Sequence, residues 1–111
     1  MRIDIKQLKF IDKTLRIIVT ELEDLLGIEF TTTSLFRIED AGVHGTLPLR
    51  GIDLRCRGYE FGKFIEKFTN DNWIYDPERQ NKNCCRFHKN RSGKGYHLHF
   101  QCCSGTKRRE V

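Results

Sequence analysis

Gly95-Tyr96-His97-Leu98-His99-Phe100-Gln101 alternates apolar and polar side chains, which is the pattern of a β-strand with one buried face. Successive side chains of a strand point to opposite faces, so we expect His97 and His99 to share one face. Leu98 and Phe100 then share the other. The stretch therefore predicts a sheet that presents two imidazoles side by side.

The neighbouring segments predict the rest of this sheet. Cys84–His88 is expected to pair with Tyr96–Cys103 as a hairpin, because the connection from Lys89 to Gly95 holds the glycines that such a turn needs. Gly51–Cys56 reads as a short strand, and Ile28–Phe36 as another, rich in β-branched and aromatic residues. His88 joins the histidine face only if the paired positions of the hairpin sum to an odd number, and the sequence leaves that register open.

Two segments have helical spacing. Apolar residues recur every three or four positions from Ile5 to Leu26, and Asp4 and Gly27 are suited to begin and end a helix there. A second helix is expected from Tyr59 to Asn70. Residues 38–49 hold two glycines and a proline and predict an irregular loop, whereas residues 73–75 suit a short strand. The predicted fold class is α+β, with helices packed on one face of a small, mainly antiparallel sheet.

Length and composition indicate one globular domain of 111 residues, with 38% hydrophobic and 32% charged residues. We assign residues 1–104 to the domain and 105–111 to a basic tail, and we expect a monomer. No apolar run approaches the roughly 20 residues of a membrane span. Met1–Asp4 lacks the start of a signal peptide, so we expect the chain in the cytoplasm, from which it would reach a cell wall on host lysis.

The formal net charge of +5 favours polyanionic partners, among them nucleic acid and anionic cell-wall polymers. Nucleic acid is the less favoured of these partners. The sequence holds neither the aromatic-basic motif of an RNA-binding sheet nor a helix-turn-helix pattern.

Five cysteines are an odd number, and without a secretion signal they favour reduced thiols or metal ligands over a disulfide framework. One rival site would combine Cys85-x-x-His88 with His99-x-x-Cys102 around a structural zinc. Positions three apart on a straight strand face opposite ways, however, so this site needs both strands bent. Small buried hydrophobes are the simpler interpretation of these cysteines.

Residues upstream of His97 and His99 indicate what chemistry the two imidazoles could perform. Catalytic zinc usually has three protein ligands, imidazole or carboxylate, and an open position for a water molecule. We expect His44, Asp53 and His99 to be these ligands. His97 would act beside them as a base or oxyanion partner, and Arg37 would offer a fixed positive charge to a carboxylate or a tetrahedral intermediate.

The order of these residues resembles a known family. Thr33–Arg37, Gly42–Gly45, Arg50–Leu54 and the final His97-Leu98-His99 together resemble the zinc D-alanyl-D-alanine peptidases of the lysostaphin, D-Ala-D-Ala carboxypeptidase and Hedgehog fold group. The resemblance implies Zn²⁺ as cofactor, peptidoglycan stem peptides as substrate, and a compact form similar to phage lysis enzymes. The paired final histidines look like the murein endopeptidase branch, in which the first histidine is catalytic.

Two features depart from the family pattern. The spacing between His44 and Asp53 is longer than usual, which predicts a bulge at residues 47–48. Tyr96 stands where the carboxypeptidase branch has a glutamate base, which leaves the role of base to His97. His88 is a further candidate, as a substrate contact or a support of the site.

The sequence thus predicts a zinc metallopeptidase of the cell wall. The alternative is a non-catalytic zinc-binding domain of the same fold that binds a host protein or nucleic acid through its basic surface.

Overall fold

A computed structural model describes residues 11–30, 32–34, 50–56, 58–89 and 95–109. Its elements, in chain order, are α2 (Lys13–Leu26), β1 (Thr32–Ser34), β2 (Gly51–Cys56), α3 (Tyr59–Asn72), β3 (Trp73–Ile74), β4 (Cys85–Lys89), β5 (Tyr96–Gln101) and β6 (Lys107–Arg108). The predicted loop at 38–49, its bulge at 47–48 and the predicted helical residues 5–10 lie outside the described residues. Across the described ranges, no helix is both long enough and apolar enough to pass through a bilayer.

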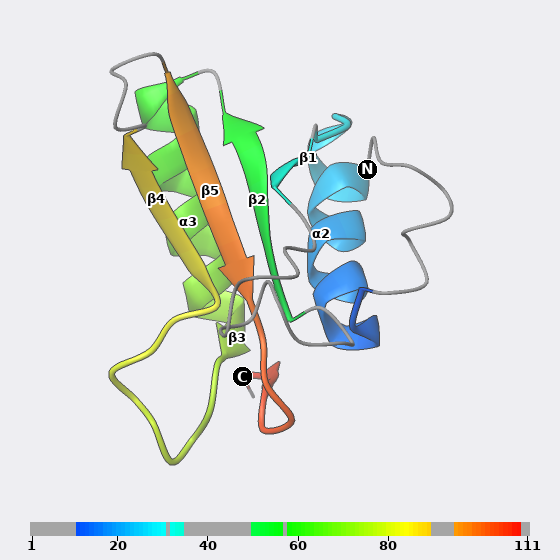
Figure 1. Cartoon of the computed structure of the whole chain (residues 1–111), viewed down its shortest axis with the longest axis vertical. Coiled ribbons are helices and arrows are strands. Elements are labelled where there is room, and N and C mark those ends of the chain that lie inside the picture. The colour runs from blue at the N-terminus through cyan, green and yellow to red at the C-terminus, as the bar shows by residue number, and fades with distance from the viewer. Residues whose placement is uncertain (1–10, 31, 35–49, 57, 90–94, 110–111) are drawn as a thin grey trace.

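The main sheet has four antiparallel strands in the order β1-β2-β5-β4, with α3 behind β4 and β5 and α2 next to β2 (Figure 1). This arrangement of an antiparallel sheet and two helices confirms the predicted α+β class. In the hairpin, His88 pairs with His97, so the paired positions of β4 and β5 sum to an odd number. On the other side of β5, His99 pairs with Asp53 of β2.

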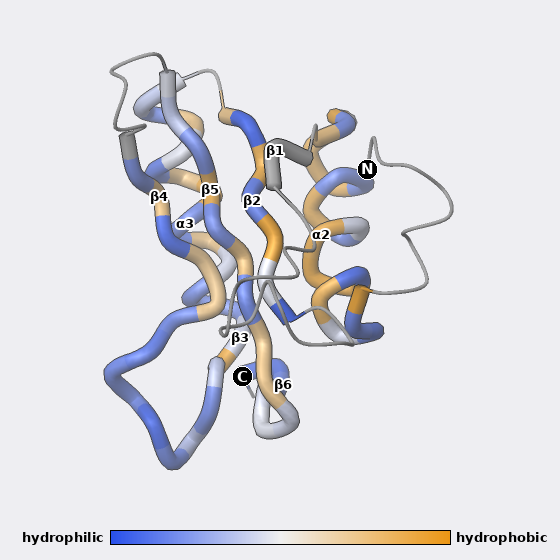
Figure 2. Tube along the Cα trace, viewed as in Figure 1, coloured by the Kyte–Doolittle hydropathy of each residue, from blue (hydrophilic) through white to orange (hydrophobic). Residues whose placement is uncertain are grey.

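The hydrophobic core lies between this sheet and the two helices. Ile52, Leu54, Leu98 and Phe100 are all fully buried, and they join the apolar side of α2 in one cluster. Figure 2 shows the alternation of hydrophobic and hydrophilic residues along β2 and β5 that produces this arrangement. One face of each strand therefore supplies the core, and the other remains available for polar side chains.

The first described helix begins later than the sequence predicted. Asp12 has an extended ψ of 139° and its side chain accepts a hydrogen bond from the Thr14 amide at 2.9 Å, so it is the N-cap of α2. The prediction of one continuous helix from Ile5 is therefore wrong, since helical spacing alone does not show where a capping carboxylate interrupts it. The predicted stop is confirmed, because Gly27 ends α2 with a left-handed φ of 66°.

Helix α3 protects the edge strand β4. The Asn70 side chain donates to the carbonyl of Cys85 at 2.9 Å and accepts from its amide at 3.0 Å, as a neighbouring strand would. Glu66 accepts a hydrogen bond from the Phe87 amide at 2.8 Å. These contacts satisfy backbone groups that an edge strand would otherwise leave unpaired. The helix extends to Asn72, past its predicted end at Asn70.

Part of the predicted basic tail is structured. Lys107 and Arg108 form β6, which pairs with Trp73 and Ile74 of β3. The guanidinium of Arg108 lies 4.4 Å from the centre of the Trp73 ring and forms an ion pair with Glu21 of α2. Residues 107 and 108 are therefore attached to the helical layer.

Gly62 brings α3 close to β4, and we expect Gly62→Ala to destabilise the fold. A Cβ at this position would lie 2.0 Å from a Phe87 ring atom. That ring is also stacked on Tyr96, with centroids 5.2 Å apart, so it has little room to move. The free energy of unfolding, measured by urea denaturation, should fall by about 1–3 kcal/mol.

Gly58→Ala is the matched control, because a Cβ there would meet its nearest neighbour at an ordinary 3.7 Å. This change should cost no more than about 1 kcal/mol, the typical difference between alanine and a preferred N-cap residue. Alanine has the higher helix propensity inside α3. A Gly62→Ala protein as stable as the unchanged chain would therefore show that the Phe87 ring moves aside and that the close contact does not limit stability.

Candidate functional site

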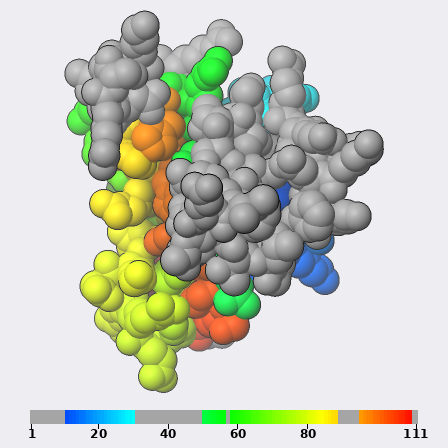
Figure 3. Space-filling view, in the orientation of Figure 1, coloured from blue at the N-terminus to red at the C-terminus, as the bar shows by residue number. Residues whose placement is uncertain are grey.

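The face of the sheet away from the helices carries a group of polar and charged side chains. They occupy alternating positions of three adjacent strands: Asp53 and Arg55 of β2, His97, His99 and Gln101 of β5, and Arg86 and His88 of β4. We call these seven residues the histidine face. Figure 3 views the molecule from this side, with atoms of β4 (yellow) and β5 (orange) at the surface.

Asp53 and His99 are the most closely connected pair on the histidine face. Their strands place them directly opposite each other, and His99 Nδ1 lies 2.8 Å from Asp53 Oδ1. Both side chains are 17% exposed. A cross-strand pair this sheltered from water interacts more strongly than an ion pair on the open surface.

The other two histidines form a second cross-strand pair. The rings of His88 and His97 have centroids 3.7 Å apart. Partial burial of the ring between its neighbours, together with His97, lowers the pKa of His88 from its ordinary value near 6.5. At pH 7 the His88 ring is therefore neutral and has a nitrogen that can accept a proton or a hydrogen bond.

Four of the six predicted site residues thus lie together: Asp53 and His99 in one pair, and His88 and His97 in the next. The other two, His44 and Arg37, lie outside the described residues. Within the described part of the chain, no group of three or more His, Cys, Asp or Glu side chains is arranged to hold a metal ion. The predicted set of three ligands includes His44 and so extends beyond that part.

The rival structural-zinc site does not have the required geometry. Cys85 is fully buried on the core face of β4, while His88 is exposed on the histidine face. Cys102 is likewise fully buried, whereas His99 belongs to the histidine face. The two halves of this motif therefore point in different directions.

Three residues of the histidine face were missed by the sequence analysis: Arg55, Arg86 and Gln101. Gln101 makes two contacts, one from its Oε1 to His99 Nε2 at 3.2 Å and one from its Nε2 to the Asn83 carbonyl at 2.8 Å. The signal that could have found Gln101 is the alternation of β5, which puts residue 101 on the same face as residues 97 and 99. Its partners could not be inferred, because Asn83 lies 18 positions away in the sequence.

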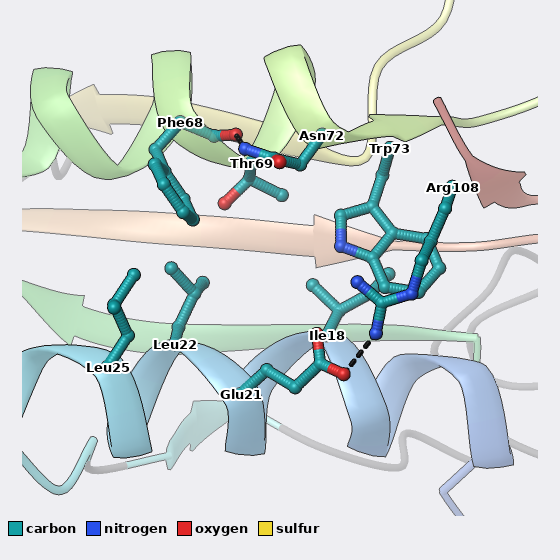
Figure 4. A pocket seen from close by; sticks show the side chains of 9 residues that line it. All are labelled: Ile18, Glu21, Leu22, Leu25, Phe68, Thr69, Asn72, Trp73 and Arg108. Carbon is teal, nitrogen blue, oxygen red and sulfur yellow. Dashed lines mark hydrogen bonds and ion pairs between the residues drawn. The ribbon is translucent and has the colours of Figure 1, made fainter. Parts of the chain in front are cut away.

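A cavity of about 230 Å³ lies elsewhere, in the helical layer (Figure 4). Its walls come from α2, α3, Trp73 of β3 and Arg108 of β6, and none of its lining residues belongs to β2, β4 or β5. Mainly apolar side chains such as Leu22, Leu25 and Phe68 surround it, and the Glu21–Arg108 ion pair closes one side. It is thus separate from the histidine face.

Comparison with protein-family models, with curated proteins and with solved structures finds no match for this chain.

The cysteines should behave as core residues in solution. Burial raises the pKa of Cys84 to about 12 and that of Cys85 and Cys102 well above the ordinary range. At pH 8 only about one Cys84 thiol in ten thousand would be ionised, and the thiolate is the reactive form. With an aromatic disulfide reagent, we expect the partly exposed Cys103 to react first and the buried thiols only after denaturation.

The same labelling after treatment with a chelator is the control. A chelator-dependent increase in reactive thiols would indicate thiolate metal ligands and contradict the assignment of these cysteines to the core.

Proposed function

We propose that this chain is a zinc-dependent peptidase that hydrolyses amide bonds in the stem peptides of peptidoglycan. The proposal is supported chiefly by the contact of His99 Nδ1 with Asp53 Oδ1 at 2.8 Å, with the His88–His97 pair beside it. An imidazole nitrogen and a carboxylate oxygen are ligands that zinc prefers. The resemblance of the sequence to the zinc D-alanyl-D-alanine peptidases supplies the substrate class.

In this proposal Asp53, His99 and His44 hold the metal. Asp53 and His99 lie opposite each other on adjacent strands, so their side chains meet without having to extend far. Ligands on regular strands favour a defined geometry. When bound there, zinc would supply a Lewis acid that polarises the scissile carbonyl and activates a water molecule.

The remaining steps belong to the protein's own side chains. A ring nitrogen of His97 accepts the proton of the attacking water and returns it to the leaving amine. His88, neutral at pH 7 and in contact with His97, orients that ring and can share its proton. Arg37 would orient a carboxylate of the substrate or the developing oxyanion, as the family resemblance implies.

A direct test combines metal analysis with clearing of a peptidoglycan suspension. We expect the purified protein to contain zinc and to clear the suspension. His97→Ala should retain zinc and lower the rate of clearing at least about 100-fold, because it removes the acid–base group only. Asp53→Ala should lose zinc as well as activity, because it removes a ligand.

Asp71→Ala is the matched control for the aspartate substitution. Asp71 is exposed on α3 and pairs with Lys67, so its loss should change neither zinc content nor clearing. A folded protein that contains no zinc would contradict the proposal.

One observation favours a second candidate, the non-catalytic zinc domain that binds a host protein or nucleic acid. Arg55 and Arg86 are exposed and flank the histidines on the same face. Such a pair of guanidinium groups suits an anionic partner. Zinc content with no clearing would favour this candidate over the peptidase.

The net charge of +5 predicts a dependence on salt that differs between substrates. The screening length falls from about 10 Å at 0.1 M to about 3 Å at 1 M salt, so attraction to an anionic wall weakens. Clearing of intact walls should therefore slow steeply with added salt, while hydrolysis of a soluble stem peptide should change little. An equal loss with both substrates would show that charge does not hold the enzyme on the wall.

A further inference from the structure

The cavity in the helical layer has a buried hydroxyl group on a mainly apolar wall. Leu22 of α2, Phe68 of α3 and Trp73 of β3 are among its apolar lining residues. Thr69 of α3 lines it as well, and only 1% of this residue is exposed to solvent. Figure 4 shows the Thr69 hydroxyl turned toward the space between Phe68 and Leu22.

The Thr69 hydroxyl lacks the partner that such a group normally has. A threonine hydroxyl inside a helix can bond to the carbonyl one turn earlier, as Thr20 of α2 does with the Arg16 carbonyl at 2.7 Å. Thr69 Oγ1, in contrast, has no hydrogen-bond partner among the described residues. The Cys85 thiol is close enough to interact with it, but a thiol is only a weak donor and acceptor. A buried hydroxyl left in this state costs stability, so it is available to a molecule that enters the cavity.

The charged groups beside the cavity are already paired with each other. Arg108 forms an ion pair with Glu21, and its guanidinium lies 4.4 Å from the centre of the Trp73 ring. A charged ligand would lose its hydration among apolar side chains without gaining a free counter-ion from this pair. The cavity therefore favours a neutral molecule.

The volume of the cavity, about 230 Å³, limits the size of that molecule. An apolar cavity of about 150 Å³ is large enough to bind benzene. The present cavity can therefore hold one aromatic ring with short substituents. The rings of Phe68 and Trp73 would give such a ligand aromatic contacts.

We propose that this cavity is a binding site for a small neutral molecule of the phenol type. Its ring lies among Leu22, Phe68 and Trp73, and its hydroxyl group bonds to the hydroxyl of Thr69. A hydroxyl group is the suitable counterpart because each of the two can donate and accept. The site does not depend on the proposed peptidase, since its lining residues come from other elements than β2, β4 and β5.

The test compares p-cresol with toluene, which lacks only the hydroxyl group. Trp73 is the single tryptophan of the chain, so its side-chain N–H gives one indole signal in a ¹H–¹⁵N NMR spectrum. We expect p-cresol to shift this signal until the site is saturated. Thr69→Val removes the hydroxyl at similar size. It should raise the dissociation constant of p-cresol about 3–10-fold, as expected for one neutral hydrogen bond, and leave that of toluene nearly unchanged.

Two further variants serve as controls. Thr69→Ser keeps the hydroxyl and should raise the dissociation constants of both probes by the same factor. Thr20→Val is the matched control, because it makes the same chemical change at an exposed position of α2 and should alter the binding of neither probe. Thr69→Val itself should unfold at an unchanged or higher urea concentration, because it removes a buried hydroxyl that lacks a partner.

Two results would overturn the proposal. One is a Trp73 signal that p-cresol does not shift, or shifts in proportion to its concentration without saturation. The other is a Thr69→Val protein in which the affinities for p-cresol and toluene change by the same factor, since the hydroxyl of Thr69 would then not recognise the ligand. Neither result affects the zinc peptidase, which is tested at the histidine face.

Discussion

The antiparallel register of β5 between β2 and β4 is the constraint on which the histidine face depends. This register places Asp53 opposite His99 on one side and His88 opposite His97 on the other. A shift of one residue in either pairing would turn the partner strand's polar side chains toward the core. The buried residues on the opposite face, such as Leu98, oppose any such shift, because they would be exposed by it. The core therefore fixes the geometry of the polar site through the strands that the two share.

Much of this fold could be predicted because local patterns and tertiary packing agree. The alternation around His97 and His99 predicted β5 and its two faces, and Gly27 predicted the end of α2. The start of α2 could not be predicted in the same way. Asp12 resembles any other polar residue of an amphipathic helix until its side chain is seen to cap the Thr14 amide. Periodicity identifies the buried side of a helix, but the choice of N-cap depends on where the preceding chain has to go.

The site was predictable in its composition but not in its connections. Alternation alone placed His97 and His99 on one face, and it showed that a zinc site built on Cys85 and His88 would need a bent strand. The contact between Gln101 and the Asn83 carbonyl depends on how the loop before β4 approaches the end of β5. No local pattern records that approach, because it depends on the register of the β4–β5 hairpin, which the sequence left open. Hydrogen-bond partners of this kind determine the chemistry of a histidine as much as its position does.

The close approach of His88 and His97 has a cost for stability. Burial and the neighbouring His97 lower the pKa of His88 in the folded chain, so below about pH 6.5 the unfolded chain binds a proton that the folded chain resists. This term reduces the stability of the fold as the pH falls through that value. A cross-strand pair chosen for stability alone would combine opposite charges or β-branched side chains. This chain instead places two imidazole rings with centroids 3.7 Å apart, beside a carboxylate–imidazole pair. Local arrangements that reduce stability in this way are typical of functional sites in other proteins.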